Sequence, residues 1–201
     1  MAAYVCADLH LGHRNIHNYR AYFDKDTISL PQTGSMKTFA DSAEHDAFVV
    51  EQWHAMKFKT RRDTIYVLGD IAFTDEAWDL FDSLPGRKVV ILGNHCTEGA
   101  GSIQKIASLK SVNSVHAALN YKGYWLTHIP IHPAELRGKR NIHGHMHDKR
   151  IDDPRYMCVS LEHTRMRPIN LDAVVTEFER RQNLNHVWKT FGWRTALKSL
   201  I

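Results

Sequence analysis

The chain has 201 residues, 43% of them apolar and 24% charged, which is typical of one globular domain with a sizeable core. The formal net charge of +4 favours an anionic substrate, because it is positive. The charge is too small to indicate nucleic acid. No apolar run approaches the roughly 18 residues of a membrane span, and three cysteines are too few and odd for a disulfide framework. We therefore expect a cytoplasmic protein without a membrane partner.

The first half of the chain alternates between predicted strands and helices. A short strand at residues 3–7 is followed by a loop-rich stretch at 12–37. Periodic apolar residues then predict helices over residues 38–59, 75–83 and 101–110, with buried β-branched strands at 64–68 and 88–92 between them. This alternation favours a parallel sheet.

The second half has shorter, more closely spaced strands, which favour antiparallel or mixed pairing. They are predicted at residues 112–119, 123–127, 141–143 and 156–161, before a helix at 171–181. We predict one domain over residues 1–182 and an amphipathic tail, 183–201, that packs on it. A partner or oligomer surface is the alternative for this tail, and the oligomeric state stays open.

Potential metal ligands recur where the predicted strands end. The five blocks are Asp8-x-His10, Gly69-Asp70, Gly93-Asn94-His95, Thr127-His128 and Gly144-His145-x-His147. Each alone is typical of a turn or helix cap, but together they supply ligands for two divalent ions sharing one carboxylate. If the first strand stays extended to its end, Asp8 and His10 point to the same side and meet one ion.

This set of blocks resembles the calcineurin-like metallophosphoesterase superfamily, and it spans about two thirds of the chain, from residue 8 to 147. The stretch Asp8–Ile16 is similar to a subgroup of small bacterial and phage phosphoesterases, for which the host cytoplasm is the expected location of phage members. The resemblance implies an α/β (α+β) fold, a four-layer αββα sandwich with two central mixed β-sheets.

The resemblance also implies how the ligands divide between two metal ions. The first ion is held by Asp8, His10 and His147, the second by Asn94, His128 and His145, and Asp70 bridges both. Mixed oxygen and nitrogen ligands suit a transition metal. We expect Mn²⁺, with Fe²⁺, Zn²⁺ or Ni²⁺ as alternatives.

The implied chemistry is in-line attack on phosphorus by a hydroxide that bridges the two metals. His95 would protonate the leaving oxygen or steady the phosphate, and such general acid help gives about 10²–10⁴ in rate. Cys96 stands where an acid is usual, and Phe73 occupies the other position from which an acid orients this histidine. We expect Asp75 to take the place of the usual acid and orient His95. We interpret Cys96 as a small buried residue without a role in catalysis.

The substrate contacts are predicted in the first loop, where His13, Arg14 and Asn15 follow the first ligand block. Arginine suits forked recognition of phosphate, although a solvated loop charge is an equal alternative.

We predict hydrolysis of phosphodiester bonds in a small phosphate-ester substrate, a nucleotide or a short nucleic acid. One alternative is a phosphomonoesterase acting on a metabolite or phosphoprotein, and the missing Gly-Asp-x-x-Asp-Arg-Gly pattern disfavours a protein phosphatase. The other is a catalytically weak, metal-binding interaction protein.

Overall fold

The structure, a computed structural model, describes residues 2–23, 35–58 and 62–191, with side chains described as far as residue 181. The larger sheet has the order β11-β1-β4-β5-β6 and the smaller one the order β10-β9-β8-β7. The strands of the larger sheet are β1 (Ala3–Cys6), β4 (Thr64–Leu68), β5 (Arg87–Ile91), β6 (Val112–His116) and β11 (Ile169–Asn170). Those of the smaller sheet are β7 (Leu119–Tyr121), β8 (Tyr124–Thr127), β9 (Arg140–His143) and β10 (Tyr156–Cys158). A hairpin, β2 (Ala21–Phe23) and β3 (Met36–Thr38), stands apart.

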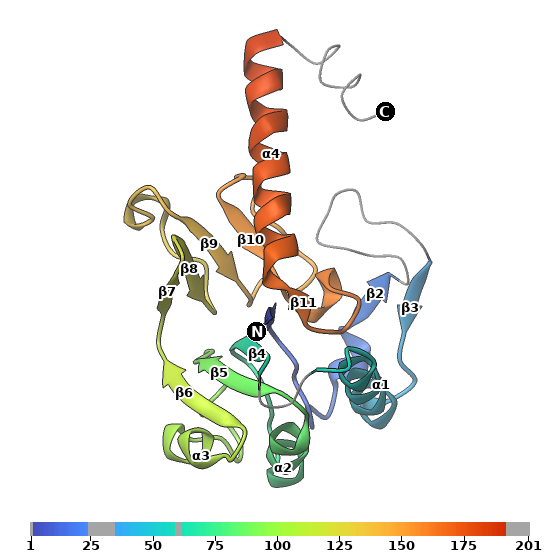
Figure 1. Ribbon diagram of the computed structural model, residues 1–201. Coiled ribbons are helices and arrows are strands. Elements are labelled where there is room, and N and C mark those ends of the chain that lie inside the picture. The colour runs from blue at the N-terminus through green and yellow to red at the C-terminus, as the bar shows by residue number, and fades with distance from the viewer. Residues whose placement is uncertain (1, 24–34, 59–61, 192–201) are drawn as a thin grey trace.

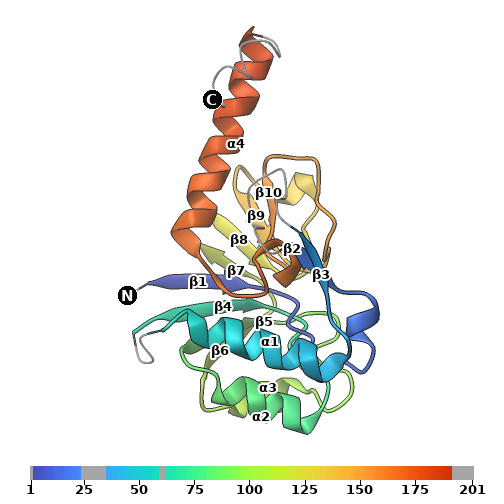
Figure 2. The ribbon, with the colours of Figure 1, turned by 90° about the vertical axis from the view of Figure 1, so that its right-hand side faces the viewer.

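Helices α1 (Ser42–Ala55), α2 (Asp75–Ser83) and α3 (Ile103–Ser108) cover the face of the larger sheet that points away from the smaller sheet (Figures 1 and 2). The long helix α4 (Leu171–Phe191) starts beside β1 and β11 and extends away from the body. Three 3₁₀ turns complete the elements: η1 (Ile16–Asn18), η2 (Pro133–Glu135) and η3 (Leu161–His163).

Two hydrophobic cores lie on the two faces of the larger sheet. Because side chains alternate along a strand, β4 sends Ile65 and Val67 to the core under the helices, and Tyr66 and Leu68 to the core between the sheets. Phe178 of α4 also packs in the second core. A strand buried on both faces therefore reads as the continuous apolar run found in the sequence.

The expected parallel pairing of the first half is confirmed, since β1, β4, β5 and β6 are parallel neighbours. Both sheets are mixed, because β11 joins the larger one and β7 the smaller one in antiparallel fashion. The fold is thus α/β with two mixed sheets flanked by helices.

Several predicted boundaries were wrong for local reasons. The first helix starts at Ser42 rather than at residue 38, because the Asp41 side chain caps it by accepting from Glu44 N. The strand predicted at 112–119 ends at His116 as β6, and Leu119 already begins β7, which belongs to the other sheet. Residues 159–161 leave the strand predicted at 156–161 and lead into η3.

The predicted division at residue 182 falls inside α4, which continues to Phe191. Residues 192–201, and the side chains from 182 onward, lie outside the described residues, so packing of the tail on the domain stays a prediction. In the described part of the chain, no helix combines the length and apolar composition needed to cross a membrane.

A buried lysine makes the stability of this fold depend on pH. Lys88 on β5 is fully buried, donates from Nζ to the Leu84 carbonyl at 2.6 Å and lies 5.0 Å above the Phe81 ring. Burial lowers the pKa of Lys88 from 10.5 to about 8. Between these values the unfolded chain binds a proton that the folded chain does not, so this group adds stability as pH rises.

We predict that the stability of the native protein, relative to that of Lys88→Met, increases by about 3 kcal/mol between pH 7 and pH 10.5. Urea unfolding of both proteins across this range measures the difference, and Lys37→Met, at an exposed site on β3, is the control. If the difference in unfolding free energy between the native protein and Lys88→Met does not change with pH, the lowered pKa of Lys88 is contradicted.

Candidate metal centre

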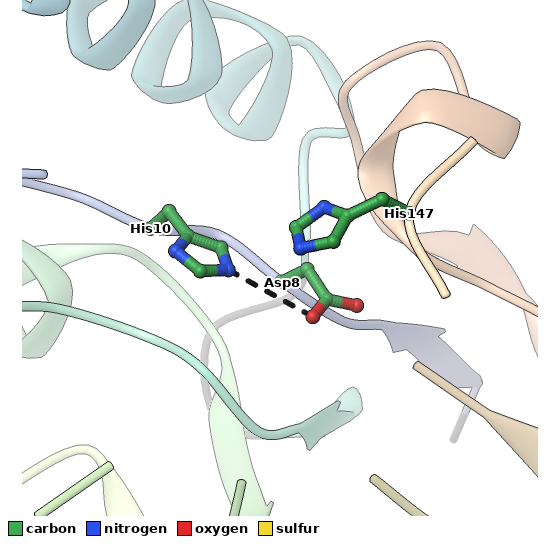
Figure 3. Close-up of side chains that lie close together, drawn as sticks. All are labelled: Asp8, His10 and His147. Carbon is green, nitrogen blue, oxygen red and sulfur yellow. Dashed lines mark ion pairs between the residues drawn. The ribbon is translucent and has the colours of Figure 1, made fainter. Parts of the chain in front are cut away.

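Two groups of three potential ligands converge where strands of both sheets end. The first group is Asp8, His10 and His147, and the second is Asp70, His128 and His145. Within each group the ligand atoms all lie within 4.8 Å of one another. Figure 3 shows the first group, with the Asp8, His10 and His147 side chains pointing toward a common centre. The sequence resemblance divides the same six residues in this way, and which ion each would hold stays a prediction.

Five of these six ligands have a left-handed backbone. Their φ angles are 60° at Asp8, 53° at His10, 50° at Asp70, 68° at His145 and 51° at His147. Such a conformation costs a residue other than glycine about 1–3 kcal/mol, and a cluster of such residues is typical of functional sites. The expectation that an extended strand aligns Asp8 with His10 is wrong, because β1 ends at Cys6 and the turns beyond it bring the two side chains together.

The Asp8 carboxylate is buried and half satisfied. Its Oδ2 accepts hydrogen bonds from His145 N at 2.9 Å and Ser160 Oγ at 2.7 Å. Among the described residues Oδ1 has no hydrogen-bond partner, and it lies 3.9 Å from His10 Nε2. Burial alone would raise the pKa of Asp8, but the neighbouring histidines outweigh this and lower it. An ionised, buried oxygen without a donor is suited to bind a cation.

Asp70 lies between the two groups. Its Oδ1 accepts a hydrogen bond from His95 N at 2.9 Å. Its Oδ2 lies 3.8 Å from His10 Nε2 in the first group and 3.2 Å from His128 Nε2 in the second. Burial opposes ionisation of Asp70, but His128 overcomes this and the pKa falls below its usual value. One oxygen of Asp70 is therefore placed to serve two ions.

Hydrogen bonds also fix the His128 ring. Its Nδ1 donates to the Leu68 carbonyl at 2.8 Å, so Nε2 is the nitrogen that faces the candidate metal site. This Nε2 lies 2.8 Å from Asn94 Oδ1 and 3.2 Å from Asp70 Oδ2, two oxygens that accept hydrogen bonds, and although burial opposes this, Asp70 raises the pKa of His128. A metal ion bound at Nε2 would replace the proton there. The predicted ligand Asn94 thus reaches the second group, and the His145 ring lies edge-on to His128 at 5.1 Å.

A buried Arg20–Glu162 pair supports the first group, and the sequence analysis missed it. Glu162 Oε1 lies 2.9 Å from His147 Nδ1 and accepts from Arg20 Nε at 2.9 Å. Arg20 also donates to the carbonyls of Asp8 at 2.6 Å and Leu9 at 3.1 Å. Burial would raise the pKa of Glu162, but Arg20 and His147 hold it well below the usual range. An ionised Glu162 keeps the proton of His147 on Nδ1 and leaves Nε2 for a metal.

The hydrogen-bonded chain continues from Arg20 into helix α1. Arg20 Nη1 lies 2.9 Å from His45 Nε2, and because arginine only donates, Nε2 accepts and the proton sits on Nδ1. That Nδ1 lies 2.8 Å from Asp46 Oδ1, while Asp46 Oδ2 accepts from Gly12 N at 2.8 Å. Helix α1 is therefore tied to the loop that carries Asp8 and His10.

His95 is partly exposed beside the first group, with its ring 6.1 Å from that of His10. Its Nδ1 lies 2.7 Å from Glu98 Oε2, which supplies the carboxylate expected from Asp75. The Asp75 expectation is wrong, since that side chain pairs with Lys105. Cys96 is buried, accepts from Gly93 N, and has a raised pKa because of burial, so the thiol is unsuited to act as a nucleophile.

The predicted substrate contacts divide between two places. His13 lines a cavity of about 330 Å³ beside the first group, and its ring lies edge-on to Phe73 at 4.9 Å. Arg14 and Asn15 are exposed in the same loop and do not line this cavity. Their role in substrate binding stays a prediction.

The residues present fit two divalent ions. The donor set combines carboxylate oxygens, an amide oxygen and imidazole nitrogens, which suits first-row transition metals. Asp8 Oδ1 and His10 Nε2 are buried and, within the described part of the chain, without hydrogen-bond partners. A cation between them would satisfy both atoms.

Comparison with known proteins leaves the family of the chain open. No family model matches it. The chain is 32% identical over 94 residues to the Gene 66 protein of Mycobacterium phage L5, a match that covers 44% of this chain and 37% of that protein. The chain thus matches just over a third of the length of this phage protein.

A solved structure has a similar fold: the protein of unknown function AQ665 from Aquifex aeolicus, with a TM-score of 0.57 and 22% identity. The alignment covers 87% of this chain and 98% of that one, so the likeness extends over nearly the whole fold.

We predict that Glu162→Gln lowers the affinity for one of two bound metal ions by about 10- to 100-fold, because without the carboxylate charge the His147 ring is no longer held in place. The affinity for the other ion should not change. Titration with Mn²⁺ by calorimetry measures both. The matched control is Glu177→Gln, which changes another buried glutamate, paired with Arg180 on α4. Equal loss of affinity for both ions, or for neither, would contradict this role.

Proposed function

We propose that the protein is a dinuclear metal-dependent phosphoesterase of the calcineurin-like type, which hydrolyses phosphodiester bonds of a nucleotide or other small phosphate ester. The observation that carries this proposal is the position of Asp70 Oδ2 between two ligand groups. The four-layer αββα arrangement and a cytoplasmic location belong to the same proposal.

The six ligand residues and Asn94 would hold the ions. When bound, two divalent ions would supply a nucleophile at neutral pH and positive charge against the phosphoryl oxygens. The chain itself contributes a proton donor, since His95 Nδ1 is engaged by Glu98 and its Nε2 remains for the leaving oxygen. Glu98 orients this ring without touching the substrate.

We predict that His95→Ala lowers kcat by about 10²–10⁴ on a diester with an alcohol leaving group, such as dithymidine phosphate, because an alkoxide needs a proton to depart. On bis-p-nitrophenyl phosphate the loss should be smaller, since p-nitrophenolate leaves without one. Glu98→Gln should show the same dependence on the leaving group, with smaller losses.

Assays with Mn²⁺ on both diesters and on p-nitrophenyl phosphate test the proposal, with Asp70→Asn as the variant that removes the shared charge. Both diesters should be hydrolysed faster than the monoester, and Asp70→Asn should abolish turnover. A native protein that binds two ions and hydrolyses none of the three would contradict the proposal. Faster turnover of the monoester would favour a phosphomonoesterase.

A further inference from the structure

The cavity beside the first metal group is lined by two of its ligands, His10 and His147, and by residues of the segment that contains η1. Its volume of about 330 Å³ falls within the usual range of small-molecule sites. We call it the ester pocket and define it by His10, His147, Ile16 and Tyr19. Neither His95 nor any residue of the second metal group lines it.

The charges of the ester pocket do not suit a second phosphate. Of the described residues that line it, Arg20 is the permanent cation, and its guanidinium is already committed to Glu162 and to the carbonyls of Asp8 and Leu9. The exposed Asp148 adds negative charge at the rim, whereas the charge of Glu162 is balanced by Arg20. An uncharged group is therefore favoured, and hydroxyl donors would find a carboxylate at the rim.

The apolar residues favour a flat group. Ile16 is buried in the wall, whereas Tyr19 is 80% exposed at the mouth of the pocket. An exposed aromatic ring offers a stacking face for a planar ligand. Any of the nucleobases gains binding energy from such a contact, because each has a flat π-face.

We propose that the ester pocket holds the uncharged ester group that stays on the phosphorus when a phosphodiester is hydrolysed. This group is a nucleoside, and Tyr19 stacks on its planar base. This inference rests on the proposed function and assigns its substrate class. Because the pocket adjoins the first metal group and His95 does not line it, we assign the retained nucleoside to the pocket and the leaving group protonated by His95 to the space outside it. The diester is thereby distinguished from a monoester, which has no group to fill the pocket.

Binding to the Mn²⁺-loaded protein tests this assignment without turnover. Thymidine 5′-monophosphate carries the retained group, and inorganic phosphate lacks it. The native protein should bind the nucleotide more tightly than phosphate. Tyr19→Ala should weaken the nucleotide by about 5- to 20-fold and leave phosphate within about twofold, whereas Tyr19→Phe should retain native affinity for both. Ile103→Ala, at an exposed apolar site on α3, is the control.

Kinetics on thymidine 5′-p-nitrophenyl phosphate should agree, with KM raised in Tyr19→Ala by the same factor and kcat unchanged. For methyl p-nitrophenyl phosphate, which has no planar retained group, Tyr19→Ala should leave KM unchanged. Equal native affinity for nucleotide and phosphate, or equal losses of both in Tyr19→Ala, would overturn the assignment even if diesters are hydrolysed. A Tyr19-dependent preference for the nucleotide without hydrolysis of any ester would instead overturn the proposed function and support the nucleoside pocket.

Discussion

The shared position of Asp70 is the constraint on which the site depends. Its Oδ2 lies between His10 of the first group and His128 of the second, so one side chain joins ligands that arrive from both sheets. The second oxygen is fixed by His95 N, which also places the predicted proton donor beside the two ligand groups. The two ligand groups can share Asp70 only while the two sheets keep this relative position, because a shift between them would separate His128 from Asp70.

Close packing of the backbone makes this placement rigid. A Cβ added at Gly69 would lie 2.5 Å from His128 Nδ1 and 2.6 Å from Gly93 Cα, and one added at Gly93 would lie 2.2 Å from Asp70 Oδ1. These two glycines allow the ends of β4 and β5 to approach closely enough for Asp70 to reach both groups. The left-handed backbone of the ligands is held by the same packing, which offsets its local cost.

The sequence predicted the parts of the site that follow from local patterns. Continuous apolar runs predicted β4 and β5. The ligand blocks at strand ends predicted the residues that the structure brings together. The Arg20–Glu162 pair left no such signal, because 142 residues separate its members and a lone buried arginine looks like a surface one in sequence. The contact of Glu98 with His95 could have been predicted, since Glu98 lies three residues after His95, the spacing at which side chains meet in a turn.

The backbone at the ligands and the division of the second half between sheets were also beyond the sequence. A strand-end Asp-x-His pattern is compatible with either an extended or a left-handed chain, and tertiary packing decides between them. Residues 117–118 carry the chain from one sheet to the other, although the apolar pattern runs on across them.

The most direct test of a shared carboxylate is electron paramagnetic resonance of the protein loaded with Mn²⁺. Two ions joined through Asp70 should bind to each chain and give a spin-coupled spectrum, and Asp70→Ala should remove the coupling. Two bound ions without coupling in the native protein, or a single binding site per chain, would contradict the account.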